Sequence, residues 1–92
     1  MIMELVWKPH ALKDRETIMD YIAKDNPLAA VELDDRFEII AESACRHPDM
    51  YKMGRVPGTH EAVVHPHYVM IYQVDSCSLQ ILRILHTARQ WP

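Results

Sequence analysis

The pattern that decides the fold lies in residues 27–45, which read PLAAVELDDRFEIIAESAC. Apolar side chains recur at steps of three and four residues, at Ala30, Leu33, Phe37, Ile40 and Ala44. This spacing is typical of one face of an α-helix, and the acidic side chains of the stretch fall on the opposite face. We therefore predict a helix over 27–45 whose apolar stripe packs Phe37 and its neighbours against a sheet.

A first helix is predicted over residues 10–24. Its inner stripe is formed by Leu12, Arg15, Met19 and Ile22. The segment 25–27, Asp-Asn-Pro, ends this helix and begins the next, because proline is tolerated in a first helical turn. Two amphipathic helices joined by a tight turn predict an antiparallel hairpin.

Strands are predicted on both sides of this hairpin. Residues 3–7 form a short strand before Pro9, and residues 46–57 are interpreted as a loop because prolines and a glycine interrupt them. Three strands follow, over 61–65, 68–74 and 79–86. The order β-α-α-β-β-β predicts an α+β fold, with the helical hairpin packed on one face of a small twisted antiparallel sheet.

Strand 79–86 is apolar on both faces, which is typical of a strand inside a sheet. Within it, Arg83 alternates with Ile81 and Leu85. A guanidinium in such a position is expected to pair with a carboxylate or to extend toward water.

Composition places the chain among ordinary globular proteins. Its 92 residues, 49% apolar and 25% charged, suit one domain over 1–92. No apolar run reaches the roughly 18–20 residues that cross a bilayer, and residues 1–7 lack a basic leader. We therefore predict a cytoplasmic protein without a membrane segment. Cys45 and Cys77 follow no metal or redox spacing and are expected to be free thiols.

Charge is distributed unevenly along the chain. Residues 1–45 carry ten acidic and five basic side chains, whereas residues 46–92 carry three acidic and five basic ones. The second half also holds five of the six histidines. Two explanations fit this asymmetry equally well. One is that the helices expose carboxylates to water, and the other is that an anionic partner docks on the second half.

Several segments resemble one family of bacterial proteins. Residues 54–61 read GRVPGTHE, residues 65–74 read HPHYVMIYQV and residues 81–92 read ILRILHTARQWP. The first helix begins with ALKD at 11–14, and the second with PLAA at 27–30. Together these segments resemble the RelE/ParE superfamily of type II toxin–antitoxin toxins, and most closely its ParE branch. The resemblance implies a cognate antitoxin that folds over the toxin, in a hetero-oligomer, and silences it.

The superfamily implies one of two activities. RelE-like toxins cut mRNA on the ribosome, whereas ParE-like toxins poison DNA gyrase. A metal-free ribonuclease needs a base, an acid and cations at the phosphate. The RelE-like pattern supplies lysines on the strand after the loop, an arginine after the aromatic residue that opens the central strand, an arginine after the last strand and a tail tyrosine.

Most of that nuclease pattern is missing here. The strand 61–64 reads EAVV without lysine, and Val69 follows Tyr68 where the pattern has an arginine. No tyrosine follows Arg89, and Arg89 itself is the one feature that matches the pattern. We therefore predict a non-enzymatic gyrase inhibitor, with a RelE-like, ribosome-dependent mRNA interferase as the alternative.

In that alternative, histidine would take over the chemistry. The candidate residues are then His65, His67, His86 and Arg89. The histidines could serve as acid and base, because imidazole titrates near neutral pH. The competing interpretation is that His86 is a hydrogen-bonded structural residue and that the two histidines beside Pro66 are exposed turn residues. No cofactor is expected, and no metal either, because two histidines without cysteines at ligand spacing do not make a zinc site.

If a protein target is bound instead, the candidate residues lie in the loop and the tail. They are Arg55, His60, Arg89 and Trp91. Loops held on a rigid sheet often carry binding residues, and arginine and tryptophan are enriched at interface hot spots. Arg55 could equally be a structural residue.

Overall fold

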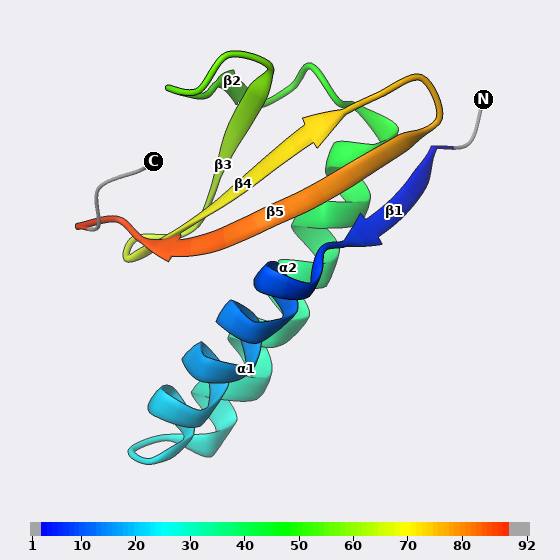
Figure 1. Cartoon of the computed structure of the whole chain (residues 1–92). Coiled ribbons are helices and arrows are strands. Elements are labelled where there is room, and N and C mark those ends of the chain that lie inside the picture. The colour runs from blue at the N-terminus through cyan, green and yellow to red at the C-terminus, as the bar shows by residue number, and fades with distance from the viewer. Residues whose placement is uncertain (1–2, 89–92) are drawn as a thin grey trace.

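The computed structural model describes residues 3–88 of the chain. Its elements are β1 (Glu4–Trp7), α1 (Pro9–Ala23), α2 (Pro27–Arg46), β2 (Lys52–Met53), β3 (Thr59–His65), β4 (Tyr68–Val74) and β5 (Ser78–His86). Figure 1 shows the helical hairpin and the sheet as two layers. The predicted α+β class is confirmed, and each predicted helix and strand is present within two residues of its expected bounds. The short strand β2 lies inside the region that was interpreted as loop.

The sheet has the strand order β1-β5-β4-β3-β2. Strands β2 to β5 pair in antiparallel fashion, but β1 pairs with β5 in parallel, so the prediction of an antiparallel sheet was wrong at this edge. A parallel neighbour requires a long crossover, which the helical hairpin and the following strands provide. Strand β5 lies inside the sheet, as its two apolar faces predicted.

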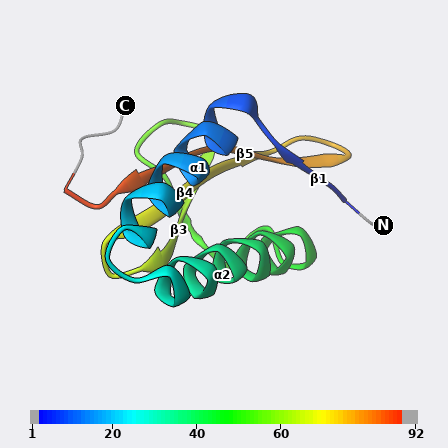
Figure 2. The same ribbon diagram turned by 90° about the horizontal axis from the view of Figure 1, so that it is seen from below.

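Both helices pack on the same side of the sheet. Helix α1 contacts β5, and α2 contacts β1, β3 and β5 (Figure 2). The turn between them is fixed by Asn26, whose side chain accepts a hydrogen bond from the backbone N–H of Ala29 at 3.1 Å, while Pro27 takes the first helical position. The other face of the sheet is not covered by either helix.

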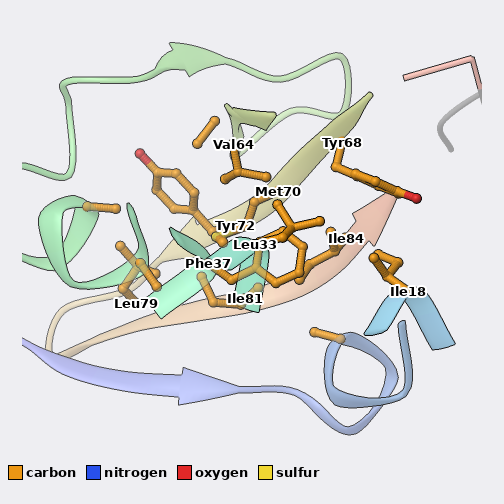
Figure 3. Packing of buried hydrophobic residues seen from close by; sticks show 14 residues of the cluster. Ile18, Leu33, Phe37, Val64, Tyr68, Met70, Tyr72, Leu79, Ile81 and Ile84 are labelled. Atoms are coloured by element: carbon orange, nitrogen blue, oxygen red, sulfur yellow. The ribbon is translucent and has the colours of Figure 1, made fainter. Parts of the chain in front are cut away.

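The core lies between the hairpin and the sheet, where Phe37 of α2 is fully buried (0% exposed), as predicted. Figure 3 shows the labelled side chains of the cluster meeting there. The largest fully buried members on the helix side are Tyr72, Phe37, Met70, Leu79, Ile81, Ile84 and Val64. Burial of these side chains supplies most of the favourable free energy of folding.

The predicted inner stripe of α1 is confirmed at Met19 and Ile22, which pack against the core, but it was wrong at Leu12. Leu12 is 50% exposed, and Ala11 and Ile18 are the buried residues of the helix. Arg15 is instead held in ion pairs with Asp34 and Glu38 of α2, at 2.6 and 2.7 Å. The short apolar face of α1 is ambiguous in sequence, since its true orientation depends on which side the partner helix and sheet occupy.

A β-bulge in β5 changes which side chains share a face. Ile71 pairs with Arg83, but Tyr72 pairs with Ile81, which leaves Leu82 as the extra residue. Ile81 therefore belongs to the core under the helices, whereas Leu85 lines the uncovered face. A strand without the bulge would place Ile81 and Leu85 on the same face.

Candidate functional site

The uncovered face of the sheet carries a shallow hollow of about 170 Å³. Its walls are formed by Lys52, Arg55, Glu61, Val63, Val69, Ile71, Leu85 and Thr87. The floor is apolar, because Ile71 and Leu85 are almost fully buried there although neither belongs to the core under the helices. Val63, beside them, is 61% exposed. The hollow thus offers an apolar surface with charged groups at its rim.

The loop at the rim is folded by local hydrogen bonds. The backbone N–H of Gly54 donates to the carbonyl of Thr59 at 2.7 Å, and the Thr59 hydroxyl donates to the carbonyl of Val56 at 2.7 Å. Gly58 has φ +83°, which glycine adopts without a Cβ clash. The GRVPGT segment therefore builds a defined turn that places Arg55 on the surface.

Arg55 lies at the edge of this hollow, as an exposed side chain. Its backbone N–H donates to the Glu61 carboxylate at 3.1 Å, so Glu61 ties the loop to β3. Among the described residues no ion pair holds the Arg55 guanidinium. The side chain is exposed, and its role in binding a partner stays a prediction.

His60, the second predicted binding residue, belongs to the opposite face of the sheet. Its ring stacks on Tyr72 with centroids 5.0 Å apart, and its Nδ1 atom is buried without a hydrogen-bond partner among the described residues. Tyr72 in turn donates from its hydroxyl to the carbonyl of Pro48 at 2.8 Å. Burial, and then the neighbouring Tyr51 and Asp49, raise the pKa of Tyr72 to about 12. His60 and Arg55 therefore do not form one surface.

The three histidines proposed for a nuclease do come together. The ring centroids of His65 and His67 lie 5.4 Å apart, and those of His67 and His86 lie 5.6 Å apart with nearly parallel rings. Tyr68 packs its edge against His86, at 5.6 Å. The strand ends meet because His65 pairs with Tyr68 and Tyr68 pairs with His86 across the sheet. The sequence analysis predicted the three histidines as candidates but missed Tyr68. The signal that could have indicated Tyr68 is its place directly after His67 in the chain.

Backbone hydrogen bonds determine which nitrogen carries the hydrogen in the neutral form of two of these rings. Nδ1 of His65 accepts from the N–H of His67 at 3.0 Å, and Nδ1 of His86 accepts from the N–H of Ala88 at 3.1 Å. An imidazole nitrogen that accepts carries no hydrogen, so the neutral ring must hold its proton on Nε2. Burial, and then the charges of His67 and Arg36, lower the pKa of His65. His86 is thus hydrogen-bonded locally, as the competing structural interpretation expected, and exposed as well.

The family is shown by comparison with known proteins. The family model described as the ParE toxin of type II toxin–antitoxin systems, parDE, matches residues 5–91. The chain belongs to the ParE toxin family. A curated relative, Toxin RelE2 of Caulobacter vibrioides, is 36% identical over 86 residues, covering 94% of this chain and 97% of that protein.

Solved structures have the same fold as this ParE-family toxin. The chromosomal ParDE toxin–antitoxin system of P. aeruginosa matches with a TM-score of 0.80 at 20% identity, over 92% of this chain and 96% of that chain. A chain of the E. coli DinJ-YafQ toxin–antitoxin complex matches with a TM-score of 0.65 at 14% identity, over 96% of both chains. These likenesses confirm the helical hairpin on a mostly antiparallel sheet as a RelE/ParE-type fold.

Other predicted features of the ParE-family chain are resolved only in part. Arg89 and Trp91 lie outside the described residues. Cys45 and Cys77 are free thiols, as predicted. Between residues 3 and 88, no three histidine, cysteine or acidic side chains are grouped to hold a metal ion, and no helix is long and apolar enough to cross a membrane.

Proposed function

We propose that this ParE-family toxin inhibits growth by binding DNA gyrase, and that a cognate antitoxin neutralises it. The observation that carries the proposal is the apolar floor of the hollow on the uncovered sheet face. The RelE-like pattern requires cations on the strand after the loop and directly after Tyr68. Here Val63 and Val69 line the hollow from those strands, and the cations of the hollow, Lys52 and Arg55, lie on β2 and in the loop instead.

Such a surface suits a protein partner better than a polyanion. A bound RNA is held by cations along its phosphates, and carboxylates repel it. Apolar area flanked by arginine is, by contrast, the usual composition of a protein–protein hot spot. Val63, exposed beside the buried Ile71, and Arg55 at the rim provide both parts.

The antitoxin would find a second apolar surface on the helical hairpin. Tyr21, Leu28 and Val31 are 69%, 66% and 58% exposed there. Val31 also lines a hollow of about 340 Å³ that is formed mainly by apolar side chains of α1 and α2. Exposed apolar groups of this kind mark sites that a folding partner segment covers. The ParDE toxin–antitoxin system of P. aeruginosa and the DinJ-YafQ toxin–antitoxin complex of E. coli, which share this fold, support this part of the proposal.

The gyrase proposal is tested by mixing purified toxin with bacterial gyrase and plasmid DNA. We expect cleaved DNA–gyrase complexes to accumulate and ribosome-bound mRNA to stay intact. Arg55→Ala should weaken both gyrase trapping and growth inhibition while changing the free energy of unfolding by less than about 1 kcal/mol, as exposed substitutions do. Lys13→Ala, which removes an exposed cation from α1, is the matched control and should behave as the wild type.

A second candidate function is supported by the meeting of His65, His67 and His86. In a metal-free ribonuclease, a protonated ring of this cluster would give its proton to the leaving 5′-oxygen and become neutral, and a neutral ring of the cluster would accept the 2′-hydroxyl proton. Ribosome-dependent mRNA cuts by the wild type, absent in a folded His86→Ala variant, would establish this activity and overturn the gyrase proposal.

A further inference from the structure

The hollow on the uncovered sheet face has an apolar floor that crosses three strands. Val63 of β3 lies directly opposite Val69 of β4, and Val69 lies directly opposite Leu85 of β5. Ile71 follows Val69 by two residues on the same face of β4 and extends the floor by one position. Val63 is exposed, whereas Ile71 and Leu85 are buried. The floor is therefore a continuous apolar surface that is most accessible at β3.

The size of the hollow suits one side chain of a partner. Its volume is about 170 Å³, whereas sites that bury a cofactor or another small molecule usually span about 300–1,000 Å³. Protein interfaces are commonly anchored by a single side chain that fills a pocket of the partner. Because the floor is formed by valine, isoleucine and leucine, an aliphatic anchor buries the most apolar surface here without leaving a polar group unpaired.

Two cations stand at the end of the floor that lies toward β2. Lys52 of β2 pairs across the sheet with Glu61 of β3, and Arg55 follows in the loop. Neither cation forms an ion pair within the part of the chain that the structure describes. Glu61 is already engaged, because its Oε2 atom accepts a hydrogen bond from the backbone N–H of Arg55 at 3.1 Å. Both cations are therefore placed to attract carboxylates that accompany the aliphatic anchor.

The composition of the hollow favours a peptide over a nucleic acid. Single-stranded nucleic acids bind where their bases stack on aromatic side chains and where many cations follow the phosphates. The described residues that line the hollow contribute two cations and no aromatic ring. A peptide segment needs neither feature, since its own side chains match the apolar floor and the two charges.

We propose that the hollow binds a peptide segment in which an aliphatic residue stands next to acidic residues. The aliphatic side chain packs on Val69 and Ile71, and the neighbouring carboxylates pair with Lys52 and Arg55. The inference deepens the proposed function and rests on it in one respect, since gyrase is then the protein that presents the segment. The class of ligand follows from the apolar floor and the two cations alone.

The proposal is tested without gyrase, by adding the blocked pentapeptide Asp-Asp-Leu-Asp-Asp to the whole chain in low salt. We expect the backbone amide resonances of Val63, Val69 and Ile71 to shift and to saturate. Replacing the leucine by alanine should weaken binding at least about fivefold, because less apolar surface is buried. Replacing the four aspartates by asparagine should weaken it at least about threefold, as the loss of two exposed charge pairs does. Added salt should weaken the acidic peptide more than the asparagine peptide, because it screens these charges.

A doubly substituted chain, Lys52→Gln with Arg55→Gln, supplies the matching change in the protein. It should bind the acidic peptide at least about threefold more weakly and the asparagine peptide as the wild type does. Both side chains are exposed, so the fold is expected to persist, which the amide spectrum checks. The control is Lys13→Gln with Lys24→Gln, which removes two exposed cations from the helical layer and should bind both peptides as the wild type does.

The proposal is overturned if the acidic and asparagine peptides bind equally, or if the control variant weakens binding as much as the double variant of the hollow. It is also overturned if the same resonances shift when the chain alone is concentrated, which indicates a second copy as the occupant. Tighter binding of a short single-stranded RNA would indicate a nucleic acid instead. Failure of the peptide while gyrase is still trapped rejects the ligand class alone. Peptide binding without gyrase trapping supports the hollow and rejects gyrase as the target.

Discussion

Arg83 of β5 donates two hydrogen bonds to the carboxylate of Asp14 on α1, from Nε to Oδ2 at 2.7 Å and from Nη2 to Oδ1 at 3.1 Å. The same carboxylate accepts from the backbone N–H of Ile84 at 3.0 Å. Strand β1 pairs with β5 only as far as Ile81, so Asp14 satisfies the β5 edge where β1 has ended. The carboxylate also holds the pKa of the Arg83 guanidinium above its ordinary value. Pairing with a carboxylate is one of the two outcomes that the sequence predicted for Arg83, the other being extension toward water.

Removing one partner of this pair should destabilise the protein strongly. Both side chains are mostly buried, at 15% and 12% exposure, so Asp14→Ala leaves an unpaired guanidinium and an unpaired backbone N–H. We expect a loss of about 3–5 kcal/mol in the free energy of unfolding, measured with denaturant. Glu16→Ala, on the exposed part of the same helix, is the control and should change it by less than about 0.5 kcal/mol. A small effect of Asp14→Ala would mean that water replaces the carboxylate.

Phe37 should be the most sensitive apolar position of α2. Its side chain is fully buried, and Phe37→Ala should cost about 3–5 kcal/mol because a cavity remains. Ile39, two residues along the helix, is 62% exposed and serves as the matched control. Thermal or denaturant unfolding of both variants tests the predicted helix face; equal losses would contradict it.

Tyr72 should be the last tyrosine to ionise. Its pKa of about 12 lies above the ordinary value of about 10, so its stabilising contribution is complete below about pH 10 and is lost as the pH rises through about 12. Ultraviolet difference absorbance should show a late step that is missing in Tyr72→Phe. That variant also loses the hydrogen bond to Pro48 and should be less stable by about 1 kcal/mol at neutral pH. Ionisation of all four tyrosines in one step would contradict the prediction.

His65 should make the protein less stable in mild acid. Its pKa in the folded chain is lowered, so the unfolded chain binds a proton first as the pH falls. The contribution is complete above about pH 6.5 and is lost as the pH falls through the folded pKa. His65→Asn should therefore reduce the difference in unfolding free energy between about pH 7.5 and about pH 5, whereas His47→Asn should leave it unchanged.

Gly58 should be required for its backbone conformation alone. A Cβ added there meets no atom within 4 Å, but φ is +83°. Gly58→Ala should thus cost about 1–2 kcal/mol, and Gly58→Asn less, because asparagine tolerates the left-handed region better than alanine. Unfolding free energies of the two variants are the measurement. Equal stability of wild type and Gly58→Ala would show that the loop adopts another conformation in solution.

Local patterns in the sequence determined most of the secondary structure. The stripe that contains Leu33 and Phe37 predicted α2, since its period is long and its two faces differ clearly. Strand β4 was predicted with its observed bounds, because Tyr68, Met70 and Tyr72 alternate with the side chains of the other face. The functional family also followed from motif order, which survives in sequence without knowledge of the packing.

Only the tertiary structure decided how these elements combine. The parallel pairing of β1, the orientation that buries Ala11 in place of Leu12, and the bulge at Leu82 all depend on neighbours far away in the chain. The same holds for the candidate site: His65 and His86 are 21 residues apart in sequence, and only strand pairing through Tyr68 brings them together. Sequence periodicity records which face of an element is apolar, whereas contacts between elements depend on register and crossing geometry, which no local pattern contains.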